Sequence, residues 1–249
     1  MKYIIGNWKM NGSKDMAWKL SLDLHQFLAA NTNVQAKMVI CPPFPYLPVT
    51  HDFLARHDSK LGLGGQDCSD KESGAFTGDI SATMLHDAGC EYVIVGHSER
   101  RQYHQEADSL IAQKIVAGQK SGLNVVLCIG ETKDQREAGK TMAILSTQLK
   151  GCLIAGIDSK KLIVAYEPVW AIGTGLNATG DDIVTAHAHI KKELTSILGQ
   201  GGQAIAILYG GSVKASNAKE ILSAPGVDGV LVGGASLKAD EFTAIYQAA

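Results

Sequence analysis

Short runs of apolar residues recur along the chain, and each is followed by a longer segment in which apolar and polar residues are mixed. Several runs, such as Val125–Ile129, are almost continuously apolar instead of alternating. Continuous runs are typical of parallel strands buried on both faces of a sheet. We therefore predict strands near Tyr3–Gly6, Lys37–Cys41, Leu61–Gly65, Tyr92–Gly96, Val125–Ile129, Leu162–Tyr166, Ala204–Tyr209 and Gly229–Val232.

The mixed segments have the pattern of amphipathic helices. Asp181 and Asp182 lie in a first turn, where the helix dipole favours negative charge. Gly89 and Gly122 follow helical runs, as C-terminal caps do. The predicted helices are Met16–Ala30, Tyr46–His57, Ser81–Ala88, Ala107–Ser121, Lys133–Cys152, Asp181–Leu198, Ala215–Ser223 and Lys238–Gln247.

Eight strand-then-helix units with no linker or low-complexity segment predict an α/β fold, a (β/α)8 barrel formed by residues 1–249 as a single domain. A doubly wound open sheet is the alternative. No G-x-G-x-x-G follows the first strand, so the sequence does not support a dinucleotide-binding fold.

Composition narrows the possible partners. The chain has 249 residues, with 45% hydrophobic residues, 19% charged residues and a net charge of −2. This balance gives no electrostatic footprint for nucleic acid or an anionic membrane. No apolar run approaches the roughly 18 residues that span a bilayer. The apolar run in the first residues, MKYIIGNW, is too short for a signal peptide.

The cysteines have no C-x-x-C spacing, so we expect neither a zinc site nor a disulfide framework. A reducing cytoplasm fits this usage best. His187 and His189 are two apart on a predicted helix and do not face one way, so we expect no metal there.

Unusual polar residues follow several predicted strands. Each has an ordinary explanation by itself, because a glycine pair is usually a turn and a lone histidine or lysine is usually structural or solvated. Together they indicate an active site, since the carboxyl ends of barrel strands meet at one face. The candidates are Asn7, Lys9, His97, Ser98, Glu99, Glu167, Ser212, Gly233 and Gly234.

The glycine-rich segments Tyr209–Val213 and Val232–Leu237 follow the last two predicted strands. Backbone N–H groups can bind phosphate where no Cβ blocks the approach, and barrels often build a phosphate site in these two loops. The sequence therefore predicts a small phosphorylated substrate.

The remaining candidates suggest proton abstraction next to a carbonyl group, through an enediolate. Glu167 can remove a carbon-bound proton, and the groups near it can stabilise oxygen charge. We expect Glu167 to lie at the barrel mouth, with little core packing. The stiff start at Pro168 and the glycines Gly173–Gly175 are typical of a lid beside such a group. Two alternatives are a lyase or aldolase that uses Lys9 as a Schiff base, and a non-catalytic scaffold.

Several motifs resemble those of the triosephosphate isomerase family, and the resemblance covers the whole chain. It implies the interconversion of dihydroxyacetone phosphate and glyceraldehyde 3-phosphate without cofactor or metal. The motifs are GNWKMNG at 6–12, GAFTGD at 74–79, VGHSERR at 95–101, CIGET at 128–132, REAG at 136–139, AYEPVWAIGTG at 165–175 and VGGASL at 232–237.

The resemblance also implies a role for each candidate. Glu167 would be the general base, His97 the neutral electrophile, and Lys9 a source of positive charge. Asn7 would hydrogen-bond the substrate, and Glu99 and Ser98 would support these groups. Backbone amides would hold the phosphate at Gly173, Ser212, Gly233 and Gly234.

The family is usually a homodimer, in which the loop after the third strand enters the neighbouring active site. Here that loop would be Gln66–Asp79, and Thr77 would contact Asn7 of the partner subunit and Lys9 of the partner subunit. We expect no nucleic-acid partner and no membrane partner.

Overall fold

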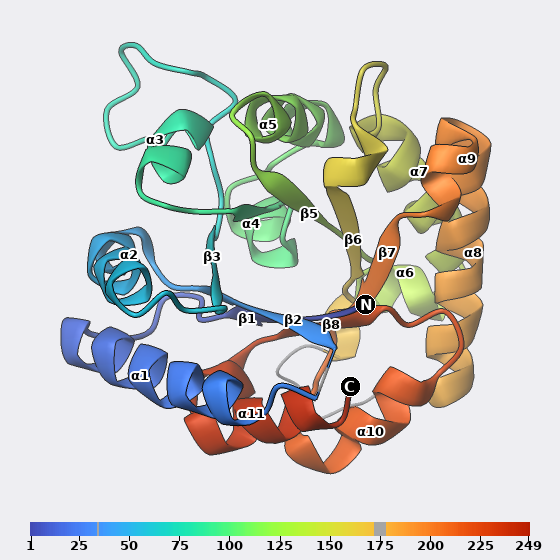
Figure 1. The fold of residues 1–249 in the computed structure, drawn as a ribbon. Helices are drawn as coiled ribbons and strands as arrows, with labels where there is room; N and C mark the ends of the chain where they lie inside the picture. The colour runs from blue at the N-terminus through green and yellow to red at the C-terminus, as the bar shows by residue number, and fades with distance from the viewer. Residues whose placement is uncertain (34, 172–177) are drawn as a thin grey trace.

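The computed structural model describes residues 1–33, 35–171 and 178–249. Eight strands pair in sequence order, all in parallel, and β1 also pairs with β8, so that the sheet closes into a barrel (Figure 1). This confirms the predicted (β/α)8 fold. The strands are β1 Lys2–Asn7, β2 Ala36–Cys41, β3 Gly62–Gly65, β4 Tyr92–Val95, β5 Asn124–Ile129, β6 Leu162–Tyr166, β7 Ala206–Tyr209 and β8 Gly229–Val232.

Helices surround the barrel. The α-helices are α1 Lys14–Ala30, α2 Leu47–Arg56, α3 Ala82–Asp87, α4 Ser98–Tyr103, α5 Asp108–Lys120, α6 Lys133–Glu137, α7 Thr141–Cys152, α8 Gly180–Leu198, α9 Gln200–Gln203, α10 Ala215–Ser223 and α11 Ala239–Gln247. Short 3-10 helices are η1 Phe44–Tyr46, η2 Ser159–Lys161, η3 Val169–Ala171 and η4 Gly234–Leu237. None of these described helices is long and apolar enough to cross a membrane.

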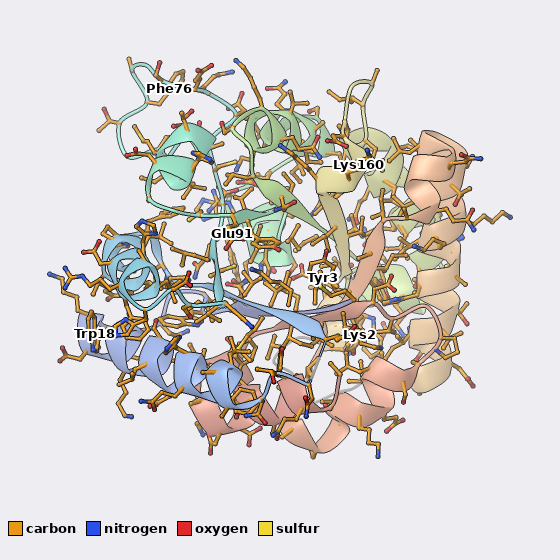
Figure 2. The ribbon with its side chains drawn as sticks, viewed as in Figure 1. Lys2, Tyr3, Trp18, Phe76, Glu91 and Lys160 are labelled. Atoms are coloured by element: carbon orange, nitrogen blue, oxygen red, sulfur yellow. The ribbon has the colours of Figure 1, made fainter. Side chains whose placement is uncertain are left out.

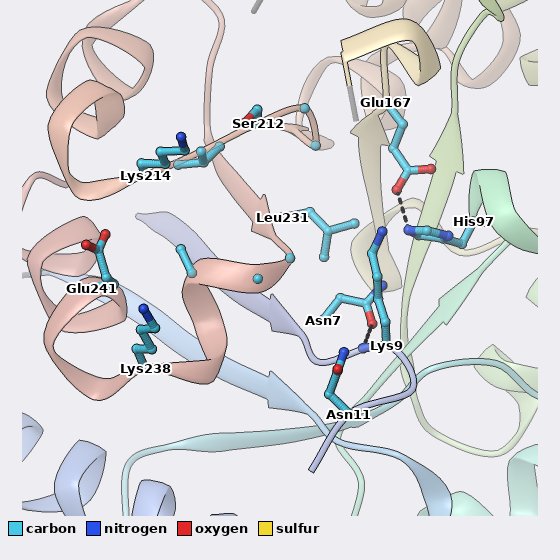
Figure 3. Close-up of a pocket in the computed structure, with 16 residues that line it drawn as sticks. Asn7, Lys9, Asn11, His97, Glu167, Ser212, Lys214, Leu231, Lys238 and Glu241 are labelled. Carbon is cyan, nitrogen blue, oxygen red and sulfur yellow. Dashed lines mark hydrogen bonds and ion pairs between the residues drawn. The ribbon is translucent and has the colours of Figure 1, made fainter. Parts of the chain in front are cut away.

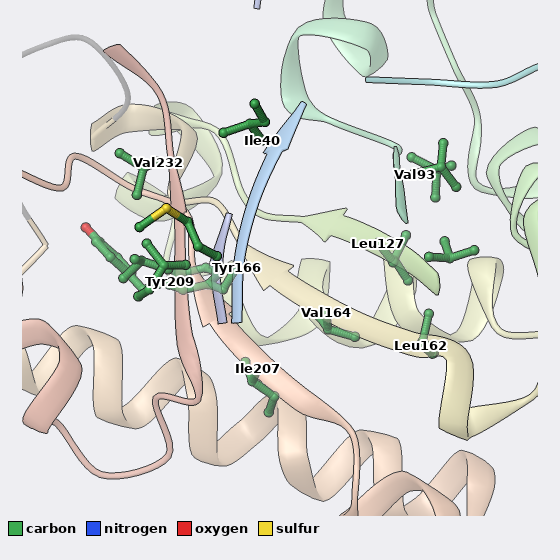
Figure 4. Packing of buried hydrophobic residues seen from close by; sticks show 14 of the residues in the cluster. Ile40, Val93, Leu127, Leu162, Val164, Tyr166, Ile207, Tyr209 and Val232 are labelled. Atoms are coloured by element: carbon green, nitrogen blue, oxygen red, sulfur yellow. The ribbon is translucent and has the colours of Figure 1, made fainter. Parts of the chain in front are cut away.

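The apolar core has two layers because successive strand residues point to opposite faces of the sheet. In β5, Val126 and Cys128 belong to a cluster made only of strand residues, which fills the barrel interior. Val125 and Leu127 belong to the larger cluster between strands and helices (Figure 4). Both faces are therefore buried, which explains why the strands read as continuous apolar runs.

Two helical predictions were incomplete. The predicted helix Lys133–Cys152 is two helices, α6 and α7, separated at Gly139, which has a φ of 67°. A positive φ cannot continue an α-helix and is readily adopted by glycine. The second difference is that the sequence analysis did not predict two short helices, α4 directly after β4 and α9 directly after α8.

The loop between β3 and α3 extends away from the barrel, and Phe76 lies at its outer end with 46% of its surface exposed (Figure 2). The base of the loop is fixed by buried ion pairs. The Lys114 Nζ lies 2.8 Å from a carboxylate oxygen of Asp67 and 2.6 Å from Glu106 Oε1. The loop therefore presents an apolar side chain to solvent from a rigid base.

All five cysteines are among the described residues, and each is buried with a free thiol. Burial raises the pKa of each thiol, to about 12 for Cys68, Cys90 and Cys152. The pKa values of Cys41 and Cys128 are raised by the same cause. None of these cysteines forms a disulfide in the structure.

We expect Leu127→Ala to lower the free energy of unfolding by about 2–5 kcal/mol, because it leaves a cavity at a fully buried position between β5 and the helices. Val116→Ala is the control, since Val116 on α5 is 40% exposed and its truncation should change stability by no more than about 0.5 kcal/mol. Urea unfolding of both variants tests this. Equal effects would contradict the assigned packing.

Candidate active site

A cavity of about 520 Å³ opens at the carboxyl ends of the strands (Figure 3). It collects side chains and glycines from the ends of β1, β4, β6, β7 and β8, as the barrel topology predicts. Its lining includes Asn7, Lys9, His97, Glu167, Gly210, Gly211, Ser212, Gly233 and Gly234. Seven of the predicted site residues therefore meet in one cavity.

The carboxylate of Glu167 is held on both oxygens. Oε1 lies 3.0 Å from Nε2 of His97 (Figure 3). Oε2 accepts a hydrogen bond of 2.9 Å from the backbone N–H of Ser98. Glu167 lines the cavity at the barrel mouth as expected, but it is only 2% exposed. The reason is α4, whose first turn covers the carboxylate.

The main chain of Glu167 lies against Gly130 at the end of β5. The N–H of Glu167 donates to the carbonyl oxygen of Ile129 over 2.7 Å. A Cβ on Gly130 would lie 1.7 Å from the carbonyl oxygen of Glu167, so only glycine fits there. Neither feature is visible in the sequence, because the contact depends on how β5 and β6 pair.

Burial opposes ionisation of Glu167, but several neighbours favour it more strongly. Charge and hydrogen bonding from His97, the Ser98 amide and the Lys9 ammonium together lower the pKa of Glu167 below its ordinary 4.5. The site therefore holds a buried carboxylate in its charged form, as a base requires.

The two ring nitrogens of His97 have different partners. Its Nδ1 accepts a hydrogen bond of 3.2 Å from the backbone N–H of Glu99, in the first turn of α4. Burial lowers the pKa of His97 and attraction to Glu167 raises it, with a net rise. With Nδ1 accepting from the Glu99 amide, the ring proton that faces Glu167 is the one on Nε2.

Lys9 is held in a backbone conformation that is uncommon for a residue with a side chain, with a φ of 52°. Its N–H donates to Asn7 Oδ1 over 3.0 Å, and its carbonyl accepts from Gln66 Nε2 over 2.9 Å. Its Nζ lies 2.6 Å from Glu99 Oε1. These contacts hold the ammonium at the cavity, near Glu167 and His97 (Figure 3).

Gln66 is a supporting residue that the sequence analysis missed. Its amide also donates to the carbonyl of Cys41 over 2.8 Å, and thus joins the ends of β1, β2 and β3. A signal was present, since Gln66 is a polar residue directly after the third predicted strand.

The glycine-rich loops form the opposite end of the cavity. A Cβ added to Gly234 would have no protein atom within 4 Å, and one added to Gly233 would approach only Lys9 Cε, at 3.6 Å. Packing within the chain therefore does not require glycine at either position. Close approach of a bound group to the backbone would explain glycine at both positions.

The other predicted residues lie around this cavity or away from it. Ser98 donates to Glu167 through its backbone N–H, and Glu99 accepts from the Lys9 ammonium. Thr77 is exposed on the loop after β3, and Gly173 lies outside the described residues. Within the described part of the chain, no group of three His, Cys, Asp or Glu side chains could hold a metal.

A (β/α)8 barrel with a buried carboxylate, an imidazole and an ammonium opposite two glycine-rich loops defines a barrel enzyme for small phosphorylated substrates. The family model described as triosephosphate isomerase matches residues 2–249. The chain belongs to this family, and is therefore an isomerase.

Individual relatives agree. The chain is 50% identical over 245 residues to triosephosphate isomerase of Chelativorans sp. (strain BNC1), covering 98% of this chain and 95% of the relative. It is 48% identical over 251 residues to that of Xanthomonas campestris pv. campestris (strain 8004), with 100% and 98% covered. A crystal structure of triosephosphate isomerase from Bartonella henselae matches with a TM-score of 0.90 and 40% identity, over 99% and 98% of the two chains.

We expect the free energy of unfolding to fall more steeply with acid in the wild type than in Glu167→Gln. A lowered pKa in the folded state adds stability that is fully present above 4.5 and is lost as pH falls through the folded pKa. Urea unfolding between about pH 3 and about pH 6, a range that includes the ordinary pKa of 4.5, tests this. Glu220→Gln, at an exposed position, is the control and should follow the wild type. Parallel profiles for wild type and Glu167→Gln would contradict the shift.

Proposed function

We propose that the chain interconverts dihydroxyacetone phosphate and glyceraldehyde 3-phosphate through an enediolate, with Glu167 as the base. The observation that carries this proposal is the charged, buried carboxylate of Glu167, 3.0 Å from His97 Nε2 in the cavity that also holds the glycine-rich loops. Membership of the triosephosphate isomerase family supports the same reaction.

In the proposed reaction, the Glu167 carboxylate takes a proton from the carbon next to the carbonyl group. The electron pair of that C–H bond forms the C=C bond of the enediolate, and negative charge moves to the carbonyl oxygen. The hydroxyl proton on the first carbon is transferred to the former carbonyl oxygen, so that the first carbon becomes the new carbonyl carbon, and the carboxylic acid of Glu167 returns the carbon-bound proton to the neighbouring carbon. No metal or cofactor is needed to balance these steps.

Oxygen charge is proposed to be stabilised by the Nε2–H of His97 and the ammonium of Lys9. The Oδ1 of Asn7 accepts the Lys9 N–H, which leaves its NH2 group to donate to the substrate. Since His97 Nε2 contacts Glu167, substrate must replace that contact. His97 is then directed at the substrate oxygen, and one carboxylate oxygen is released for proton transfer.

The phosphate group is proposed to bind backbone amides of Ser212, Gly233 and Gly234. A phosphate site built from backbone amides needs no cluster of cations. Such a site is therefore compatible with the net charge of −2. The amide of Gly173 is a further proposed donor, from the lid segment, which lies outside the described residues.

The Schiff-base alternative is disfavoured by the contact between Lys9 Nζ and Glu99 Oε1, at 2.6 Å. This contact uses the Lys9 nitrogen as a donor to a carboxylate, whereas a Schiff base needs that nitrogen free to attack a carbonyl carbon. A non-catalytic scaffold would not need the contacts that hold Glu167, His97 and Lys9 together. The presence of these contacts therefore disfavours that alternative.

Assembly and location are also proposals. We propose that residues 1–249 act as one domain and pair as a homodimer, with Thr77 contacting the partner subunit. The exposed Phe76 at the tip of the same loop supports this. Five free thiols support a reducing compartment, and we propose the cytoplasm.

We expect Glu167→Asp to lower kcat for isomerisation by about 10²-fold, because a carboxylate shortened by one methylene moves about 1 Å from the reacting carbon. Conversion of glyceraldehyde 3-phosphate in a coupled assay measures this. Glu220→Asp makes the same chemical change at an exposed helix position and should retain wild-type kcat. An active Glu167→Asp variant, within a few-fold of wild type, would mean that another residue is the base.

We expect the wild type to sediment as a dimer at micromolar concentration, and Phe76→Asp to shift it towards monomer by placing a charge in the proposed interface. Activity should fall with the dimer, since Thr77 would no longer reach the partner subunit. Val116→Asp adds the same charge on exposed α5 and should leave the dimer intact. A fully active wild-type monomer would rule out the proposed assembly.

A further inference from the structure

Arg136 on α6 contacts two segments that lie on either side of residues 172–177. Its guanidinium carbon lies 4.1 Å from the centre of the Trp170 ring, and its Nη2 lies 3.0 Å from Asp182 Oδ1. We propose that Arg136 is a positioning residue for isomerisation, which holds the turn after Glu167 against the start of α8. This inference rests on the proposed function of Glu167.

The first contact fixes the turn that leaves Glu167. Trp170 belongs to η3, and its Nε1 donates to Glu131 Oε1 over 2.9 Å. The N–H of Val169 donates to the carbonyl of Glu131 over 3.1 Å. Glu131 lies between β5 and α6, so the turn is anchored to the same segment that carries Arg136 (Figure 1).

The second contact fixes the start of α8. Thr179 and Asp182 form a reciprocal capping box, in which Asp182 Oδ2 accepts from the N–H of Thr179 over 3.1 Å and the N–H of Asp182 donates to Thr179 Oγ1 over 3.2 Å. The remaining carboxylate oxygen, Oδ1, faces Arg136. Asp182 therefore joins the cap of α8 to α6.

One guanidinium can make both contacts because it is planar. Its face stacks on an indole while its edge donates to a carboxylate. A lysine ammonium at the same place can attract the carboxylate or the ring, but lacks the flat surface that fixes their relative position. Arg136 is therefore suited to set a distance between two segments.

The effect on catalysis passes through the main chain. Glu167 is fixed on one side by Ile129 and Gly130, and its other side continues through Pro168 into the turn held by Trp170. Arg136 is not among the residues that line the cavity. Movement of this turn would shift the carboxylate, and a displacement of about 1 Å can cost about 10²-fold in rate.

The test compares kcat and KM of Arg136→Gln, Arg136→Lys, Trp170→Leu and the double variant Arg136→Gln/Trp170→Leu. Lys133→Gln is the matched control, because Lys133 is also a cation on α6, but it pairs only loosely with Glu137, at 3.8 Å. We expect kcat to fall about tenfold in Arg136→Gln with KM nearly unchanged. Arg136→Lys should recover part of this loss, and Lys133→Gln should match the wild type.

The double variant distinguishes positioning from a general loss of stability. If Arg136 acts through Trp170, kcat of the double variant will be close to that of Trp170→Leu alone, because contacting residues are not additive. Additive losses in kcat, or Arg136→Gln within twofold of wild type, would overturn the inference. If Arg136→Gln does not fold, Arg136→Lys decides: unchanged kcat would overturn it. An inactive wild type would instead contradict the proposed function.

Discussion

The close approach of Gly130 to Glu167 is the contact on which the site depends. Parallel pairing of β5 with β6 brings the two chains together, and the absence of a side chain at Gly130 lets the Glu167 carbonyl lie against it. This contact sets where the main chain of β6 ends. The carboxylate can then reach both His97 and the first turn of α4.

Charge in the site is controlled by donors supplied by the main chain as much as by side chains. The Ser98 amide helps to keep Glu167 ionised, and the Glu99 amide donates to His97 Nδ1. Both amides belong to the first turn of α4. A short helix that contributes little to the core therefore supplies a main-chain donor to each of the two groups.

The sequence predicted the barrel well because several strands, such as β5 and β6, are buried on both faces and so are almost continuously apolar. It predicted seven of the residues that line the cavity, because the carboxyl ends of barrel strands meet at one face and so many polar groups are unusual there. It did not predict α4, since Ser98–Tyr103 is polar throughout and has no apolar stripe. The break at Gly139 was missed because one glycine within an amphipathic pattern costs a helix only about 1 kcal/mol. The burial of Glu167 could not be predicted, because it comes from contacts between segments far apart in the chain.

The free thiols have a consequence for how the molecule meets oxidants and alkylating reagents. The thiolate is the reactive form of cysteine, and in the closed barrel every thiol is both shielded and difficult to ionise. Modification therefore requires the surrounding strands and helices to separate first. The rate at which a given cysteine is labelled in native buffer thus reports how often its part of the barrel opens, with Cys128 reporting on the interior and Cys152 on the α7 side.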